Sequence, residues 1–241
     1  MKNLFALFAA LSLVLSISAG ANPPAAAHAA SAGHSAHGAA GVDPDKAWQW
    51  LKNGNTRFVK GNLRRDGQNN QARQANVAGQ HPHAILVSCS DSRVPPELVF
   101  DQKIGELFVV RSAGQSLDDS GIASIEYAVE HLGPRLIVVM GHESCGAVKA
   151  ALDTMESKKA GSPSLDHLVA NLHPHFSTLA KGPRSNGLVI EGKANVKGVA
   201  KDLVTRSAIV RDALEHGKIK IVTGLYRLGS GQVEWDESSA H

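Results

Sequence analysis

The two cysteines of the chain each lie in a short polar segment that follows an apolar run. Cys89 opens a segment in which Asp91 and Arg93 follow at alternate positions, and Cys145 comes three residues after His142. At that spacing an imidazole and a thiol can both face one metal ion, while the other thiol approaches from a neighbouring strand. Two thiolates and one imidazole leave one tetrahedral position of a zinc ion open, which is typical of catalytic zinc sites.

Two other interpretations of the cysteines compete with zinc. A structural disulfide is the usual state of two cysteines in an oxidising compartment. A redox-active pair fits less well, because the thiols are far apart in the sequence and form no Cys-x-x-Cys motif. The cysteine pattern by itself therefore leaves zinc and a disulfide as alternatives.

The order of motifs along the chain resembles the beta-class carbonic anhydrases. Cys-x-Asp-x-Arg at 89–93 and His-x-x-Cys at 142–145 carry the resemblance, with similar segments at 53–58, 79–82, 108–111, 124–129, 145–148 and 231–233. This ordered set favours zinc over a disulfide. It implies a lyase that holds one zinc ion through Cys89, His142 and Cys145 and interconverts carbon dioxide and bicarbonate by means of a zinc-bound hydroxide.

The resemblance also implies roles for four further residues. Asp91 and Arg93 would form a catalytic carboxylate–guanidinium pair, and Asp91 would ligate zinc only in a closed state of the site. Gln80 would reach across from a partner subunit to bind bicarbonate, and Gly146 would belong to the same substrate-binding site. We therefore expect a homodimer, with a tetramer as the alternative.

One position departs from the pattern of the family. Residue 115 is Gln in an Ala-Gly-Gln segment where the family usually has Asn. We therefore expect the wall of the pocket to differ while the metal ligands are unchanged.

Two other functions remain open. Relatives with the same ligands hydrolyse carbon disulfide or carbonyl sulfide, and a non-catalytic zinc-binding module would have no use for Asp91 and Arg93.

The charge of the ligands predicts how activity depends on pH. Two thiolates cancel the formal charge of the zinc ion, whereas three neutral histidines leave it intact. The pKa of the zinc-bound water should therefore lie above the value of about 7 found with three histidines. We expect hydration activity to rise with pH through the alkaline range, and a rate that stays flat from about pH 6 to pH 9 would contradict this charge argument.

Four apolar runs predict the strands that must position these residues. They lie at 84–87, 107–110, 136–140 and 218–223, and amphipathic segments separate them. Nearly continuous apolar strands joined by helices predict an α/β fold with a mainly parallel central sheet and helices on both faces. Both chemistry-bearing motifs directly follow a predicted strand, at the carboxyl end where open parallel sheets bind ligands.

Helix signals complete the predicted domain. Asp43 and Pro44 suit the N-cap and first position of a helix. Further helices are predicted at 122–132, ending at Gly133, and at 196–214 as one long helix that stops at Gly217. Residues 225–235 predict a C-terminal edge strand or hairpin.

Several other polar residues receive structural interpretations. Glu143, between two expected ligands, is predicted to be solvated or to cap a helix. His173 and His175 are predicted to lie on the surface. Arg111 and Glu126 are predicted to serve buried or interface pairing.

The amino-terminal residues predict export. Lys2 precedes an apolar run, and Ala19-Gly20-Ala21 fits a signal-peptidase site, so residues 1–21 are predicted to be a cleaved signal peptide of a bacterial periplasmic protein. The run falls short of the ~18 apolar residues of a membrane span. Residues 22–41, rich in Ala and His, are predicted to form a flexible linker before one zinc domain at 42–241.

Composition and charge limit the classes of molecule that the protein is expected to bind. The 241 residues are 43% hydrophobic and 20% charged, which is ordinary for a soluble globular protein. A net charge of +3 without a block of like charges argues against a nucleic-acid partner. The expected partner is a small molecule, carbon dioxide or bicarbonate.

Overall fold

The computed structural model describes residues 41–179 and 182–236. The predicted signal peptide and all but the last residue of the predicted linker lie outside these ranges, so both stay predictions. No helix within the described ranges is both long and apolar enough to cross a membrane.

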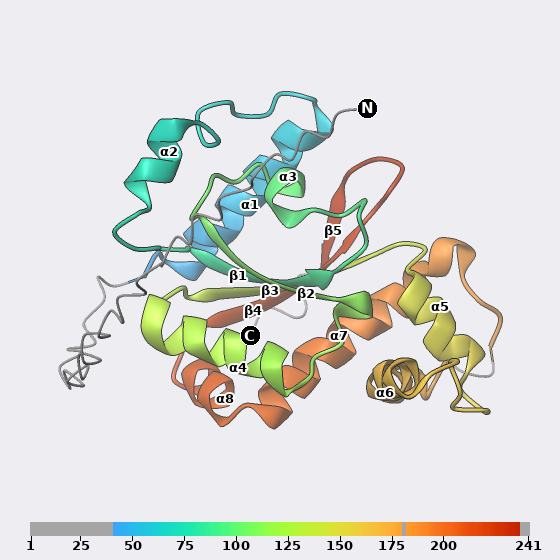
Figure 1. The fold of residues 1–241 in the computed structure, drawn as a ribbon. Helices are drawn as coiled ribbons and strands as arrows, with labels where there is room; N and C mark the ends of the chain where they lie inside the picture. Colours follow the sequence, from blue (N-terminus) through green and yellow to red (C-terminus); the bar gives the residue numbers. More distant parts are fainter. Residues whose placement is uncertain (1–40, 180–181, 237–241) are drawn as a thin grey trace, which may run out of the picture. The chain divides into compact units, whose positions relative to one another are not determined.

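A five-stranded sheet forms the centre of the domain, with strand order β2-β1-β3-β4-β5 (Figure 1). The strands are β1 (Ala84–Cys89), β2 (Leu107–Ser112), β3 (Leu136–His142), β4 (Lys220–Tyr226) and β5 (Val233–Asp236). The pairs among β2, β1, β3 and β4 are parallel, and β5 lies antiparallel to β4 at the edge. The predicted mainly parallel sheet with a C-terminal edge strand is confirmed.

The strands continue past their predicted carboxyl ends. β1 reaches Cys89 and β3 reaches His142, because polar residues there still pair with neighbouring strands. Cys89 pairs with Ser112 of β2, and His142 pairs with Tyr226 of β4. An apolar run therefore predicts which part of a strand is buried. The residue at which the strand ends depends on its backbone pairing with the neighbouring strands. The two ligands are thereby fixed in the sheet itself.

Helices cover both faces of the sheet (Figure 1). They are α1 (Pro44–Val59), α2 (Asn70–Ala75), α3 (Pro96–Val99), α4 (Asp119–Tyr127), α5 (Gly146–Asp153), α6 (Pro163–Leu172), α7 (Val189–Arg206) and α8 (Ala208–Glu215). Because side chains alternate across a strand, neighbouring residues pack into two separate hydrophobic cores, one on each face of the sheet. Leu86 packs in the core that includes α1 and α5, whereas Ile85 and Val87 pack against α4, α7 and α8.

The predicted ends of two helices are confirmed. The Asp43 side chain caps α1 by accepting a hydrogen bond of 3.0 Å from the backbone N–H of Lys46. The helix that begins with α4 continues as a π-helical turn, Ala128–Leu132. It ends at Gly133, whose φ of +75° suits a left-handed helix terminus.

The single long helix predicted before Gly217 is wrong, because the chain forms α7 and α8 with a break at Ser207. Ser207 has an extended backbone, and its hydroxyl accepts from the N–H of Val210 at 3.1 Å. The same hydroxyl donates to Glu126 at 2.6 Å. The apolar period runs through the break because α7 and α8 both bury residues against the same core, so periodicity alone could not locate it.

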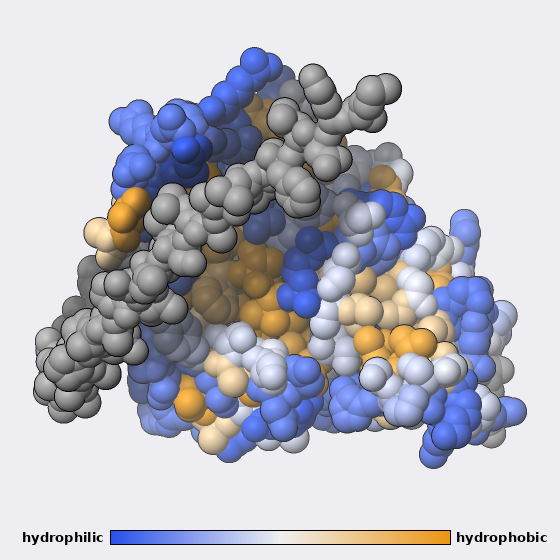
Figure 2. All heavy atoms as spheres, viewed as in Figure 1, coloured by the Kyte–Doolittle hydropathy of each residue, from blue (hydrophilic) through white to orange (hydrophobic). Residues whose placement is uncertain are grey.

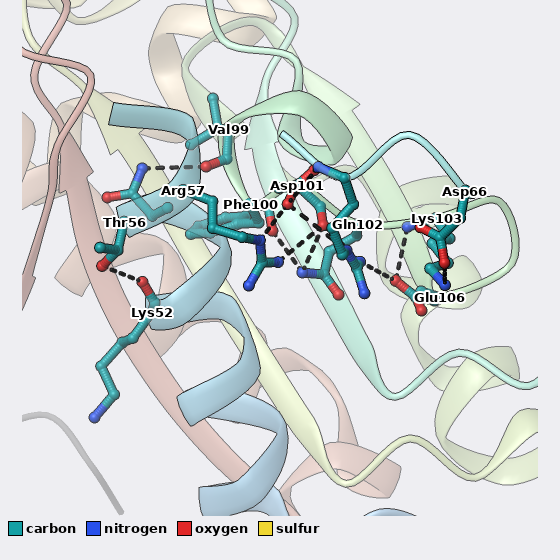
Figure 3. A network of polar contacts seen from close by, with 12 residues as sticks. Lys52, Thr56, Arg57, Asp66, Val99, Phe100, Asp101, Gln102, Lys103 and Glu106 are labelled. Carbon is teal, nitrogen blue, oxygen red and sulfur yellow. Dashed lines mark hydrogen bonds and ion pairs between the residues drawn. The ribbon is translucent and has the colours of Figure 1, made fainter. Parts of the chain in front are cut away.

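A polar network ties the connection between α3 and β2 to the end of α1 (Figure 3). Arg57 of α1 pairs with the buried carboxylate of Asp101. The backbone N–H of Arg64 also donates to Asp101, at 3.0 Å, and its guanidinium contacts Glu106 at 2.9 Å. Since this connection leads directly into β2, the network holds the start of the strand that flanks the site.

Candidate metal centre

Three side chains converge where two neighbouring parallel strands end. Cys89 is the last residue of β1, His142 is the last residue of β3, and Cys145 immediately precedes α5. Their candidate ligand atoms all lie within 4.8 Å of one another. The residues are 5%, 1% and 2% exposed, respectively. The predicted convergence of these three residues is therefore present in the fold.

The donor set fits zinc. His142 Nδ1 lies 2.9 Å from the backbone carbonyl of Glu143, and a carbonyl only accepts hydrogen bonds. Nδ1 therefore carries the proton, and Nε2 presents its lone pair. Nε2 is buried and has no hydrogen-bond partner among the described residues. A buried acceptor without a donor beside two thiols is the arrangement that a zinc ion would satisfy.

The thiols of Cys89 and Cys145 contact each other directly. Both are free cysteines, and their sulfurs are 3.9 Å apart, well beyond a disulfide bond of about 2.05 Å. The contact from Cys145 lowers the pKa of Cys89 to about 4, with further help from His142 and from the N–H of Gly114. The same contact raises the pKa of Cys145. Two neighbouring thiols of this kind suit zinc, which binds both sulfurs as thiolates.

Asp91 and Arg93 form a forked ion pair beside the three ligands. Arg93 Nε donates to one carboxylate oxygen of Asp91 at 2.9 Å, and Nη2 donates to the other at 2.7 Å. The guanidinium of Arg93 holds the pKa of Asp91 well below its usual range, so the carboxylate is ionised at neutral pH. Asp91 Oδ2 lies 3.8 Å from His142 Nε2.

Arg111 is a site residue that the sequence did not identify. It lies on β2, where it pairs in register with Ser88 of β1. Its Nε donates to the carbonyl of Cys89 at 2.9 Å, and its Nη2 donates to the carbonyl of Asp91 at 2.8 Å. Arg111 therefore holds the backbone of the Cys-x-Asp-x-Arg segment rather than an acidic partner. Only the register of two parallel strands reveals this.

The segment that departs from the family pattern forms a tight turn against the ligands. Gly114 and Gln115 both have positive φ, of +66° and +56°, and the Gly114 N–H donates to Cys89 Sγ at 3.3 Å. The Gln115 side chain is buried over Gly141, where a Cβ would lie 2.8 Å from Gln115 Nε2. The glycine at 141 thus provides the space that the longer side chain needs.

The two predicted substrate-binding residues lie in different places. Gly146 is the first residue of α5, next to Cys145, with open space around its Cα. Gln80 is exposed and precedes β1, at the amino ends of the strands. Five residue steps of about 3.3 Å separate Ala84 from Cys89, so the start of β1 is already about 17 Å from the ligands. One chain does not bring Gln80 to its own metal centre.

Two interpretations of polar residues are wrong. Glu143 is neither solvated nor a helix cap: it pairs with Arg227 at 3.1 Å and accepts from the N–H of Gly229 at 3.2 Å. These contacts attach the ligand-bearing strand to the β4–β5 connection. The His175 side chain is only 4% exposed, and that of half-buried His173 contacts the Thr154 hydroxyl at 3.1 Å. Neither histidine belongs to the open surface.

Comparison with known families decides the class of protein. The sequence model of the family described as carbonic anhydrase matches residues 84–233, which include all three candidate ligands. The chain belongs to the carbonic anhydrase family. Relatives named carbonic anhydrase confirm this over most of the chain. The protein from Mycolicibacterium smegmatis is 38% identical over 192 residues, covering 80% of this chain and 93% of the relative. Carbonic anhydrase 2 of Mycobacterium tuberculosis is 37% identical over 191 residues, covering 79% and 92%.

Solved structures place this carbonic anhydrase in the beta class. The b-carbonic anhydrase CafA of Aspergillus fumigatus is 28% identical, with a TM-score of 0.61 over 70% of this chain and 81% of that one. The beta-carbonic anhydrase CcaA, 24% identical with a TM-score of 0.64 over 79% and 95%, shares the fold. The predicted class, the α/β fold and a zinc-dependent carbon dioxide hydratase are thereby confirmed.

Proposed function

We propose that this carbonic anhydrase hydrates carbon dioxide to bicarbonate and a proton at Cys89, His142 and Cys145, with Asp91 and Arg93 as its catalytic pair. One observation carries the assignment of the pair: an ionised carboxylate lies 3.8 Å from the unpartnered His142 nitrogen. Zinc, when bound there, supplies a Lewis acid that makes a water molecule acidic enough to react. The hydrolysis of carbon disulfide or carbonyl sulfide has no comparable support.

Each residue of the pair has a distinct task. Asp91 stays ionised, so its carboxylate can only accept a hydrogen bond and would orient the reacting hydroxyl group. Arg93 holds both carboxylate oxygens in a planar fork, which prevents Asp91 from rotating. Arg111 fixes the backbone beneath them. The fork holds Asp91 toward Arg93, with Oδ2 3.8 Å from His142 Nε2, which supports an open site.

Zinc analysis of the purified protein, paired with stopped-flow hydration assays across pH, tests the proposed function. We expect one zinc ion per chain and a hydration rate that increases with pH through the alkaline range. Stoichiometric zinc without carbon dioxide hydration at any alkaline pH would overturn the proposal in favour of a non-catalytic zinc protein. Parallel assays with carbonyl sulfide and carbon disulfide measure whether either gas is a better substrate.

We further propose a homodimer in which Gln80 completes the site of the partner. Gln80 lies at the edge of the sheet opposite to its own metal centre, which supports a role across subunits. The outer strand β2 supplies a suitable contact surface, because its residues are all at least partly exposed and its first four are apolar. Figure 2 shows apolar residues gathered in the middle of the face where Figure 1 places β2. An apolar, unpaired strand edge is a typical association site.

Hybrid dimers test the placement of Gln80. The Gln80→Ala protein is expected to lose about tenfold in activity or more, the cost of a hydrogen bond to a bound anion. The Cys89→Ser protein is expected to be inactive. In a hybrid of the two, the intact metal centre receives Gln80 from the other chain, so random pairing should restore about a quarter of wild-type activity per chain. If mixing the variants restores nothing, Gln80 does not act across subunits.

Export to a bacterial periplasm is the third proposal. Its support is the charged, apolar and small-residue pattern of residues 1–21. Amino-terminal sequencing of protein recovered from a periplasmic extract should begin at Asn22, and an intact Met1 would refute cleavage.

A further inference from the structure

His175 is a buried histidine whose two ring nitrogens both face oxygen atoms. It lies in the 3-10 turn His173–Phe176, and its side chain is 4% exposed. Nδ1 is 2.9 Å from Asn195 Oδ1, and Nε2 is 2.8 Å from Asp202 Oδ2. Asn195, Gly198 and Asp202 are spaced i, i+3 and i+7 on α7, so they share one face of that helix.

Gly198 provides the space that the His175 ring fills. A Cβ at position 198 would lie 2.2 Å from ring atoms Cγ and Cδ2, which is far inside van der Waals contact. The ring therefore lies directly against the backbone of α7. Any side chain at position 198 would displace it from Asn195.

The direction of each hydrogen bond in this cluster follows from its partners. Asn195 is fully buried, and its Nδ2 donates to the carbonyl of Gly114 at 2.7 Å. A carbonyl cannot donate, so the amide oxygen of Asn195 must face His175, and Nδ1 of the ring must be the donor. The other ring nitrogen, Nε2, faces the Asp202 carboxylate at 2.8 Å, which holds the ring in this orientation.

The other end of the cluster reaches a metal ligand. Gly114, whose carbonyl accepts from Asn195, donates its own N–H to Cys89 Sγ at 3.3 Å. Gly114 has a φ of +66°, and glycine can leave that conformation easily because it has no Cβ. A hydrogen bond that holds its carbonyl therefore also sets where its N–H points.

We propose that His175 is a positioning residue of the metal centre: through Asn195 it holds the Gly114 N–H on the sulfur of Cys89. The inference rests on the proposed role of Cys89 as a zinc ligand. An N–H donated to a ligating thiolate stabilises its charge and fixes its orientation. Outer partners of metal ligands commonly change metal affinity by about 10- to 100-fold when they are lost.

Two amide substitutions at position 175 separate this role from simple packing. The amide nitrogen of asparagine is three bonds from Cα, as Nδ1 of histidine is, so His175→Asn keeps a donor toward Asn195. The amide nitrogen of glutamine is four bonds away, as Nε2 is, so His175→Gln keeps the contact with Asp202 and loses the one with Asn195. Gly198→Ala displaces the ring without changing it, and alanine favours the helix by about 1 kcal/mol over glycine.

Zinc affinity measured by competition with a chromophoric chelator, together with the absorption spectrum of the cobalt(II)-loaded protein, tests the proposal. We expect the zinc dissociation constant to rise about tenfold in His175→Gln and Gly198→Ala, with a shifted sulfur-to-cobalt charge-transfer band. His175→Asn should match the wild type in both measurements. Circular dichroism reports the fold of each variant, and Gly198→Ala tests the proposal separately from His175→Gln because it retains the His175 side chain.

Two results would overturn the proposal. One is wild-type affinity and an unshifted cobalt spectrum in both His175→Gln and Gly198→Ala. The other is a loss in His175→Asn as large as in His175→Gln, which would indicate packing rather than the Nδ1–H bond. A wild-type chain that holds no zinc would instead overturn the proposed function, and this inference with it.

Discussion

Replacing Cys89 with serine is expected to remove zinc from the purified protein and to lower hydration on the order of 10³-fold or more. Serine has nearly the size of cysteine, so the buried end of β1 should keep its packing. Its hydroxyl stays protonated at neutral pH, whereas the cysteine ligates as a thiolate. His142 and Cys145 would then be left with one thiolate and one imidazole, too few to hold the ion in an open tetrahedral site.

The measurement is zinc content per chain together with the hydration rate, and circular dichroism reports the fold. Ser90→Ala is the matched control, because Ser90 is the exposed neighbour of Cys89 and is not a candidate ligand. It should keep zinc and activity. If Cys89→Ser keeps stoichiometric zinc, another donor completes the site, and Asp91, 3.8 Å from His142 Nε2, would be the first residue to test for direct ligation.

The position of the ligands was predictable because it depends on two features that a sequence carries. Cys89 and His142 directly follow apolar runs, and neighbouring parallel strands end at the same edge of a sheet. Cys145 needs only the spacing from His142. Strand order is less accessible: β1 and β3 are neighbours in space, although β2 lies between them along the chain. The family resemblance, not the periodicity, chose zinc over a disulfide.

The residues around the ligands were harder to predict because their roles depend on distant partners. Arg111 reaches the carbonyl of Cys89 only through the register of β1 and β2. His175 is buried only because Gly198, on another helix, leaves room for its ring. The sequence predicts buried or interface pairing for Arg111 and a surface position for His175, and it does not identify the partner of either residue. Tertiary contacts determine these partners, and no local pattern encodes them.

Arg93→Ala is expected to leave zinc bound while lowering hydration by about 100-fold, the range of a positioned proton-transfer group. Arg93 is 53% exposed, and an ordinary exposed ion pair contributes only about 0–1 kcal/mol to stability. The fold should therefore survive. Without the fork, the carboxylate of Asp91 is free to rotate away from the reacting group or onto the metal. Either movement removes the acceptor that orients the hydroxyl group.

Loss of charge on Asp91 does not account for this effect. Arg93 depresses the pKa of Asp91, so removing the guanidinium lets that pKa return upward toward the ordinary carboxyl value. A carboxyl group with an ordinary pKa of about 3.9 is still ionised at neutral and alkaline pH. The hydration rate of Arg93→Ala should therefore stay below that of the wild type at every pH of the assay. The carboxylate of Asp91 has lost its orientation and not its charge.

Zinc analysis and stopped-flow hydration across pH measure the effect, with Arg65→Ala as the control. Arg65 is exposed, and its removal gives the same net charge as Arg93→Ala, so a general electrostatic effect on the reaction would appear in both. Arg93→Lys keeps the charge but loses the fork, and its activity should fall between those of the wild type and Arg93→Ala. Zinc loss in Arg93→Ala would assign Arg93 to folding of the site, and full activity would reduce the pair to a surface contact.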